Sequence, residues 1–141
     1  IINHRDNIFL IETKADILFS YGYTKESVRF YEQVINNIPN NFYAQVRIFQ
    51  NINNKDLSTV KSRELFFNNF NLLENYYSNK KILINYLDLA KRINQKEWIK
   101  FLEYLLDATS SNKLNKYDVK KFLNTKDKNL SNLIKIIYNK I

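Results

Sequence analysis

The sequence predicts an all-α protein of about seven helices, arranged as stacked antiparallel helical hairpins. Apolar residues recur at intervals of three and four along most of the chain, which is the spacing of one helix face. The only glycine, Gly22, and the only proline, Pro39, lie where the first helical pair would turn and end. With 45% hydrophobic and 15% aromatic residues, the chain of 141 residues can bury a substantial core, so we expect one compact domain.

Within this domain we expect two parts. Residues 1–57 would form a helical hairpin with a third helix, and residues 58–141 would form a basic helical extension packed on it. The chain begins at Ile1 and contains no methionine, so we also expect it to be a fragment of a longer protein.

The first helix is predicted from four apolar residues at helical spacing: Ile8, Ile11, Ala15 and Leu18. Asp6 or Asn7 would act as its N-cap. Gly22 would stop it, because the residue after a helix often adopts a left-handed conformation that glycine tolerates best.

The second helix would begin with Thr24 as N-cap and Glu26 in the first turn, where a negative charge complements the helix dipole. Its inner face is apolar and comprises Val28, Tyr31, Val34, Ile35 and Ile38. Pro39 would end it, because the residue before a proline is disfavoured in the helical region.

A helix, a glycine turn, a second helix and a closing proline within residues 8–41 resemble a tetratricopeptide repeat. Four residues match that family's pattern: the small Ala15, the turn glycine Gly22, the aromatic Tyr31, and Pro39; Ser27 stands at its second small position. Three positions depart from it: Lys14, where leucine is usual, and Ser27 and Val34, where alanine is usual. The resemblance covers about a quarter of the chain and implies a right-handed α-solenoid. The alternative is an ordinary helical hairpin that happens to use one glycine and one proline.

Two more helices are predicted before residue 80. A third helix follows from four apolar residues: Phe42, Val46, Phe49 and Ile52. Ser58 would cap one uninterrupted helix over residues 58–77, with Val60, Phe66 and Phe70 among its core residues. No second glycine turn follows the third helix, so the repeat pattern is not sustained.

The remaining chain predicts an antiparallel pair of helices over residues 82–108 and two helices after it. Trp98 is expected in the core, with a binding anchor as the alternative. Residues 109–116 would form a mobile polar loop, followed by a short helix near Tyr117 and Phe122. The last helix is predicted from Leu130, Leu133, Ile137 and Ile141.

The net charge of +8 is concentrated in the second half of the chain. Residues 1–70 hold eight Lys and Arg against seven Asp and Glu, whereas residues 71–141 hold fourteen against seven. A basic surface attracts nucleic acid, an anionic membrane or an acidic protein. The alternative is the coding bias of an AT-rich bacterial genome, which enriches lysine and asparagine on solvated faces.

The composition argues against most catalytic chemistry, so we expect no enzyme, no cofactor and no metal. The chain has no cysteine, one glycine and one histidine, His4, which excludes thiol catalysis, phosphate-binding glycine loops and a Cys/His zinc site. The carboxylates Glu12, Asp16, Glu97 and Glu103 are expected to be solvated. No run of residues is apolar enough for a transmembrane segment. The compartment stays open between the cytoplasm and the periplasm or cell envelope.

The resemblance implies a non-catalytic scaffold that binds another protein or a peptide, since the first helix of such a repeat lines the ligand surface. Carried over to this sequence, the partner-binding residues are Phe9, Glu12, Asp16, Phe19 and Ser20. Their two acids would repel a partner's C-terminal carboxylate, so we expect an apolar or basic segment instead.

Three alternatives stay open. The chain could bind nucleic acid through basic residues of its second half: Lys80, Lys81, Lys91, Arg92, Lys96 and Lys100. It could also be the non-catalytic helical end of a larger envelope protein or protease. A homo-oligomer is the third possibility.

Overall fold

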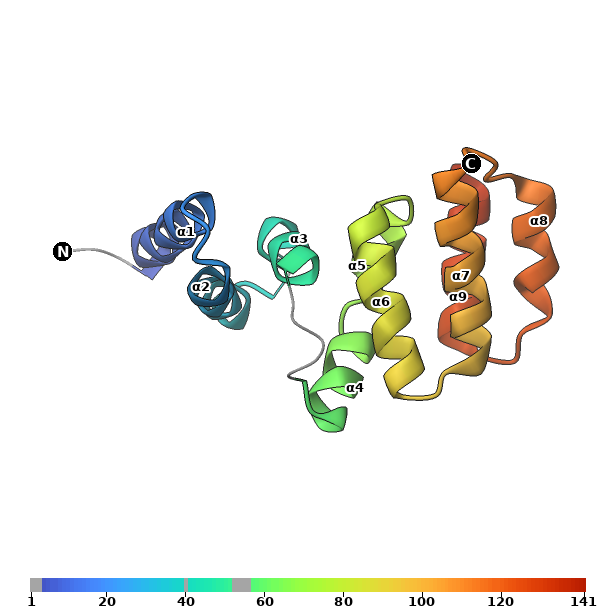
Figure 1. Cartoon of the computed structure of the whole chain (residues 1–141), viewed down its shortest axis with the longest axis horizontal. Coiled ribbons are helices and arrows are strands. Elements are labelled where there is room, and N and C mark those ends of the chain that lie inside the picture. Colours follow the sequence, from blue (N-terminus) through green and yellow to red (C-terminus); the bar gives the residue numbers. More distant parts are fainter. Residues whose placement is uncertain (1–3, 40, 52–56) are drawn as a thin grey trace. The chain divides into compact units, whose positions relative to one another are not determined.

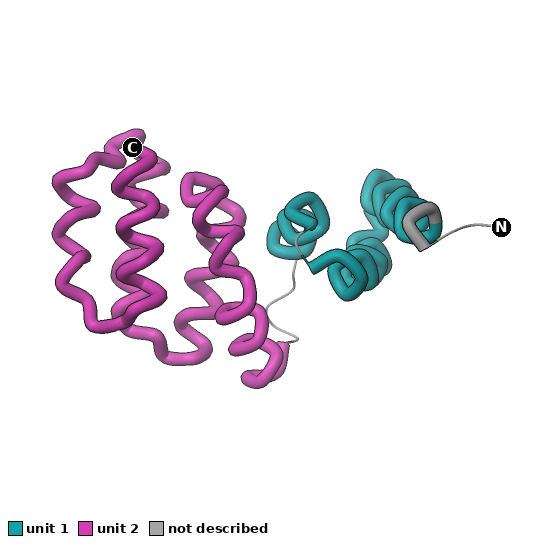
Figure 2. The backbone as a smooth tube through the Cα atoms, turned by 180° about the vertical axis from the view of Figure 1, so that it is seen from behind, with its two compact units in different colours: residues 1–52 teal, residues 53–141 magenta. Residues whose placement is uncertain are grey.

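The computed structural model describes residues 4–39, 41–51 and 57–141 (Figure 1). In these ranges the chain forms nine α-helices, one 3₁₀ helix and no strand, which confirms the prediction of an all-α protein. The chain divides into two compact units, Ile1–Ile52 and Asn53–Ile141, which we call unit 1 and unit 2 (Figure 2). The sequence placed this division at residue 57.

Unit 1 contains helices α1 (His4–Ser20), α2 (Thr24–Asn37) and α3 (Phe42–Asn51), and α2 packs against both of the others. Ala15, Tyr31 and Val34 are fully buried, as the sequence predicts. The small Ser27 is also fully buried, and its hydroxyl donates to the Thr24 carbonyl oxygen at 3.1 Å. The small side chains of Ala15 on α1 and Ser27 on α2 let these two helices approach closely.

The helix starts in unit 1 differ from the predicted caps. Helix α1 begins at His4, so positions 6 and 7 lie inside it and not at its N-cap position. Helix α2 begins at Thr24, and the capping position is Tyr23, which makes no side-chain cap bond. The predicted helix end at Pro39 is close to the observed one, because α2 ends at Asn37.

Three apolar residues assigned to inner faces are exposed: Ile38, Phe42 and Val60. Each lies at or near a helix end, where the chain leaves the regular spacing on which the assignment depended. Ile52, predicted for the same core, lies outside the described residues.

Unit 2 contains α4 (Thr59–Phe67), α5 (Phe70–Tyr76), α6 (Lys80–Arg92), α7 (Lys96–Ser110), α8 (Lys116–Lys120), the 3₁₀ helix η2 (Lys121–Asn124) and α9 (Lys128–Lys140). The predicted single helix over residues 58–77 is wrong, and so is the count of about seven helices. The chain breaks after α4 at Asn68 and Asn69, and the Asn69 side chain donates to the Leu65 carbonyl oxygen at 2.9 Å. Asparagine competes for backbone hydrogen bonds in this way and so favours helix ends.

The break lets aromatic rings from α4 and α5 meet α7. Trp98 on α7 is 1% exposed, which confirms its predicted place in the core. Its ring stacks on Phe70 at 4.9 Å between ring centroids and contacts the edge of Phe66 at 5.1 Å. The indole N–H donates to Asp127 Oδ2 at 3.2 Å. Asp127 also caps α9, since its Oδ1 accepts from the Leu130 backbone N–H at 3.0 Å.

Three helices end in the same left-handed turn. The turn residue has positive φ in each case: Gly22 (84°), Asn94 (56°) and Asn112 (55°). The backbone N–H of the following residue reaches five residues back in each turn: Tyr23 to Leu18 at 2.9 Å, Gln95 to Ala90 at 3.0 Å, and Lys113 to Ala108 at 2.8 Å. This is the Schellman arrangement, which satisfies carbonyl groups at a helix end. The prediction that Gly22 stops the first helix is therefore confirmed.

Candidate functional site

The predicted partner-binding residues of α1 meet the start of α3. Glu12 Oε2 accepts a hydrogen bond from Asn41 Nδ2 at 3.3 Å. The Arg47 guanidinium lies over the Phe19 ring, 4.1 Å from its centroid. Helices α1 and α3 therefore present one joint polar and aromatic surface, which we call the α1/α3 surface. We define it by six residues: Phe9, Glu12, Asp16 and Phe19 of α1, with Tyr43 and Arg47 of α3.

Asp16 is the residue that ties the three helices of unit 1 together. Its Oδ1 accepts one hydrogen bond from the Tyr31 hydroxyl of α2 and another, at 2.8 Å, from the Tyr43 hydroxyl of α3. The Tyr31 and Tyr43 rings meet edge to face, 6.0 Å apart. Asp16 is half-buried, so the expectation of a simply solvated carboxylate is wrong.

Burial and hydrogen bonds shift the pKa values of Tyr31 and Arg47 in this cluster. Burial, together with the hydrogen bond to Asp16, raises the pKa of Tyr31 far above its usual value. A hydrogen bond from Arg47 Nη2 to the Tyr43 hydroxyl, at 3.4 Å, raises the pKa of Arg47. At neutral pH Tyr31 is thus a hydrogen-bond donor and Arg47 a cation.

Two predicted residues stand apart from this network. Phe9 is 68% exposed, which leaves most of its ring open to a partner. Ser20 is exposed, and its hydroxyl donates to the Asp16 carbonyl oxygen within its own helix at 2.9 Å. Ser20 therefore satisfies a backbone group of α1.

Sequence reasoning missed Asn41, Tyr43 and Arg47. Tyr43 and Arg47 are four residues apart and so share one side of α3. That spacing was the available signal. The spacing shows that the two side chains share one face of α3, but it does not show which other helix that face contacts.

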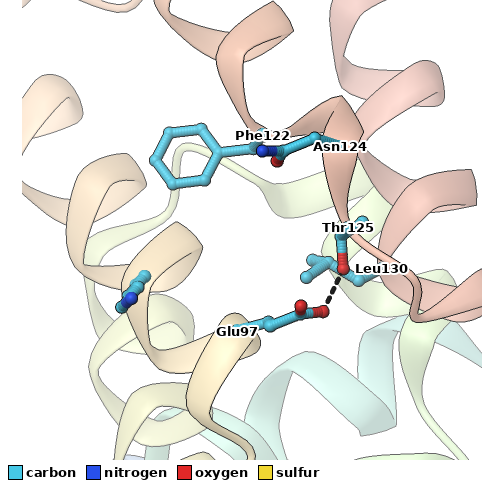
Figure 3. A pocket seen from close by; sticks show the side chains of 6 residues that line it. Glu97, Phe122, Asn124, Thr125 and Leu130 are labelled. Atoms are coloured by element: carbon cyan, nitrogen blue, oxygen red, sulfur yellow. Dashed lines mark hydrogen bonds between the residues drawn. The ribbon is translucent and has the colours of Figure 1, made fainter.

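Unit 2 has a concave feature between α7 and the segment from η2 to α9 (Figure 3). The cavity has a volume of about 210 Å³ and is lined by Glu97, Lys100, Phe122, Asn124, Thr125 and Leu130. The Thr125 hydroxyl donates to Glu97 Oε2 across it. Ligand pockets usually measure about 300–1,000 Å³, so this cavity is too small for a typical metabolite.

The basic residues predicted for nucleic acid are divided between separate places. Lys80 and Lys81 begin α6, whereas Lys91 and Arg92 end it, a separation of about 15 Å at the usual helical rise. Lys96 and Lys100 lie on α7, next to the acidic Glu97. Arg92 donates to the Leu57 carbonyl oxygen at 3.3 Å. These six residues do not form one cluster.

Within the described ranges, no group of three or more His, Cys, Asp and Glu side chains is placed to hold a metal ion. None of the helices seen there has the length and apolar character that crossing a membrane would need. The side chain of His4 lies outside the described part. Comparison of the chain with protein-family models, curated proteins and solved structures gave no match.

Proposed function

We propose that unit 1 is a protein-binding module of stacked helical hairpins, similar to a tetratricopeptide repeat, and that it acts without catalysis. Its ligand would be a segment of another protein, held on the α1/α3 surface. The observation that carries the proposal is the fixed position of Asp16, whose carboxylate is bound by Tyr31 and Tyr43 from two other helices. A binding group held this way loses little freedom when a partner arrives.

The chemistry of the surface favours a partner segment that combines a cationic or amide group with apolar side chains. Both tyrosine hydroxyls bond to Oδ1 of Asp16, so Oδ2 keeps acceptor capacity for a partner's N–H group. Phe9 offers an exposed aromatic ring on the same helix. Glu12 adds a second negative charge, so two negative charges stand against the one positive charge of Arg47, and the surface attracts lysine and arginine more than a carboxylate.

Selection from a library of displayed random peptides tests this proposal, with the chain as bait. We expect enriched peptides to carry lysine or arginine beside aromatic or aliphatic residues. Phe9→Ala should weaken binding of an enriched peptide about tenfold, because an exposed aromatic anchor is a typical hot spot. Phe9→Ala combined with Glu12→Lys should weaken it about 100-fold. Phe19→Ala, which removes the ring beneath Arg47, should also weaken it.

The matched control is Val60→Ala combined with Glu64→Lys on α4, which likewise removes an exposed apolar group and reverses the charge of one acidic side chain. Thermal melts show whether each variant is folded. The proposal fails if no peptide is enriched, or if the control variant loses binding as much as the α1 variant does. Enrichment of acidic peptides would also contradict it.

A further inference from the structure

All of the net charge of the chain belongs to unit 2. Residues 1–52 contain five Lys and Arg against five Asp and Glu, whereas residues 53–141 contain seventeen against nine. The net charge is therefore zero for unit 1 and +8 for unit 2. The positive charge that could attract an anionic partner therefore lies on the lysines and arginines of unit 2.

Four of the fifteen lysines of unit 2 lie between residues 113 and 121, just before α8, on it and at the start of η2. We call this place the α8 lysine face and define it by five exposed residues: Lys113, Lys116, Tyr117, Lys120 and Lys121. Val119 of α8 is fully buried, and helical spacing places Tyr117 on the opposite side of the helix. Asp118 is the only acidic residue between positions 113 and 124. Four positive charges thus stand against one negative charge.

Local contacts position several of these side chains. Lys116 Nζ lies over the Tyr138 ring of α9, 5.0 Å from its centroid. Lys121 Nζ lies over the Tyr117 ring at 4.5 Å and forms an ion pair with Asp118 at 3.5 Å. Asp118 of α8 also accepts from Asn115 Nδ2 at 2.8 Å, so its carboxylate is already engaged by two neighbouring residues. Two of the four lysines, Lys116 and Lys121, are therefore positioned by aromatic neighbours.

We infer that the α8 lysine face binds single-stranded nucleic acid. The lysines contact phosphate groups, and a base stacks on the side of the Tyr117 ring that Lys121 leaves open. Tyr117 is 74% exposed, and an exposed ring among lysines is the combination that binds single strands without sequence preference. Lys116 and Lys120 are four residues apart, so they reach neighbouring points on one strand.

Two other anionic partners fit the face less well. A membrane surface requires an apolar helix face that enters the lipid, but the aliphatic residue of α8, Val119, is buried in the unit. An acidic protein would satisfy the lysines and would have no need of the exposed Tyr117 ring. Nucleic acid uses both features of the face.

Fluorescence anisotropy with a labelled single-stranded oligonucleotide tests the inference, in a series of salt concentrations. For the full chain we expect log K to fall with log salt by about 0.7 for each phosphate contact, hence a slope of about −3 for four lysines. Lys116→Glu combined with Lys120→Glu should weaken binding about tenfold or more and reduce the slope by about half. Tyr117→Ala should weaken binding about tenfold and Tyr117→Phe should restore it, because phenylalanine also stacks.

The control variant carries Lys81→Glu and Lys91→Glu, two exposed lysines of α6, and changes the net charge equally. It should weaken binding about threefold at most. Equal losses in the two lysine variants would mean that net charge alone drives binding and would overturn the inference. The inference is also overturned if polyglutamate or anionic vesicles bind as tightly as the oligonucleotide, or if the oligonucleotide does not bind at low salt. Circular dichroism confirms that each variant is folded.

Discussion

The cores of units 1 and 2 contain the same kind of contact, a hydrogen bond from a buried aromatic side chain to an aspartate, but the surfaces of the two units differ. In unit 1 the buried Tyr31 donates its hydroxyl to Asp16 of another helix, and in unit 2 the buried Trp98 donates its indole N–H to Asp127 at the start of another helix. Outside these cores the units diverge. Eight of the eleven exposed large hydrophobic side chains among the described residues belong to unit 1, whose net charge is zero, although it is the shorter unit.

The difference teaches that the average composition of this chain describes neither unit. A charge of +8 spread over 141 residues suggests a uniformly basic protein. When the charge is counted for each unit separately, unit 1 is neutral and has most of the exposed apolar groups, whereas unit 2 is strongly basic and has few of them. We therefore propose a polypeptide partner for the first surface and a polyanion for the second.

The largest expected effect comes from the core of unit 2. Trp98→Ala should lower the free energy of unfolding by about 3–5 kcal/mol, because it leaves a large cavity beside Phe66 and Phe70 and removes a hydrogen-bond donor to Asp127. Denaturant titration followed by circular dichroism measures this change. Val60→Ala, at an exposed site of the same unit, should change the free energy by less than about 0.5 kcal/mol. A small effect of Trp98→Ala would contradict the described core.

The corresponding change in unit 1 is Asp16→Ala, with a smaller expected effect. Removal of the carboxylate leaves the hydroxyl of the buried Tyr31 without its acceptor, which should cost about 1–3 kcal/mol. Asp16→Ala combined with Tyr31→Phe should recover part of this loss, since phenylalanine carries no unpaired hydroxyl. The exposed Glu32 of α2 provides the control, and Glu32→Ala should have little effect on the same denaturation curve. Equal losses in the two single variants would refute the role given to Asp16.

The helix-ending turns give the finest comparison between the units. Gly22→Ala should cost about 1 kcal/mol, because alanine is strained at a φ of 84° even though no heavy atom beyond the adjacent residues lies within 4 Å of the added Cβ. Asn94→Gly, at the equivalent turn of unit 2, should change stability by only a few tenths of a kcal/mol, because asparagine already tolerates this conformation. Thermal melts of the two variants measure both values. If Asn94→Gly destabilised the protein more than Gly22→Ala, the two turns would not be equivalent.

The sequence predicted the helical class, the Gly22 turn and the buried places of Tyr31 and Trp98. These features depend on local spacing or on a large side chain that has few alternatives to burial. The sequence did not predict the break at Asn68 and Asn69, because the apolar spacing continues across it.

The sequence also did not predict the helix-ending turns that are formed by asparagine. Asn94 and Asn112 adopt the conformation that Gly22 adopts, but asparagine is common throughout this chain and so gives a weak turn signal.

The sequence predicted only part of the candidate site, because local patterns do not show contacts between distant residues. The α1 residues Phe9, Glu12, Asp16 and Phe19 were named from the sequence, yet their neighbours Tyr43 and Arg47 were not. These contacts join residues 27 and 28 positions apart, and no local pattern reports such a pairing. The α8 lysine face was missed because its lysines were averaged into the charge of the whole second half.

The most direct test of the central claim is one titration experiment with two ligands, an enriched peptide and a single-stranded oligonucleotide. The Phe9→Ala/Glu12→Lys variant should lose the peptide and keep the oligonucleotide, whereas the Lys116→Glu/Lys120→Glu variant should do the reverse. Only the oligonucleotide should show a steep dependence on salt. If either variant lost both ligands, or if neither variant lost the ligand assigned to it, the assignment of separate binding surfaces to the two units would be wrong.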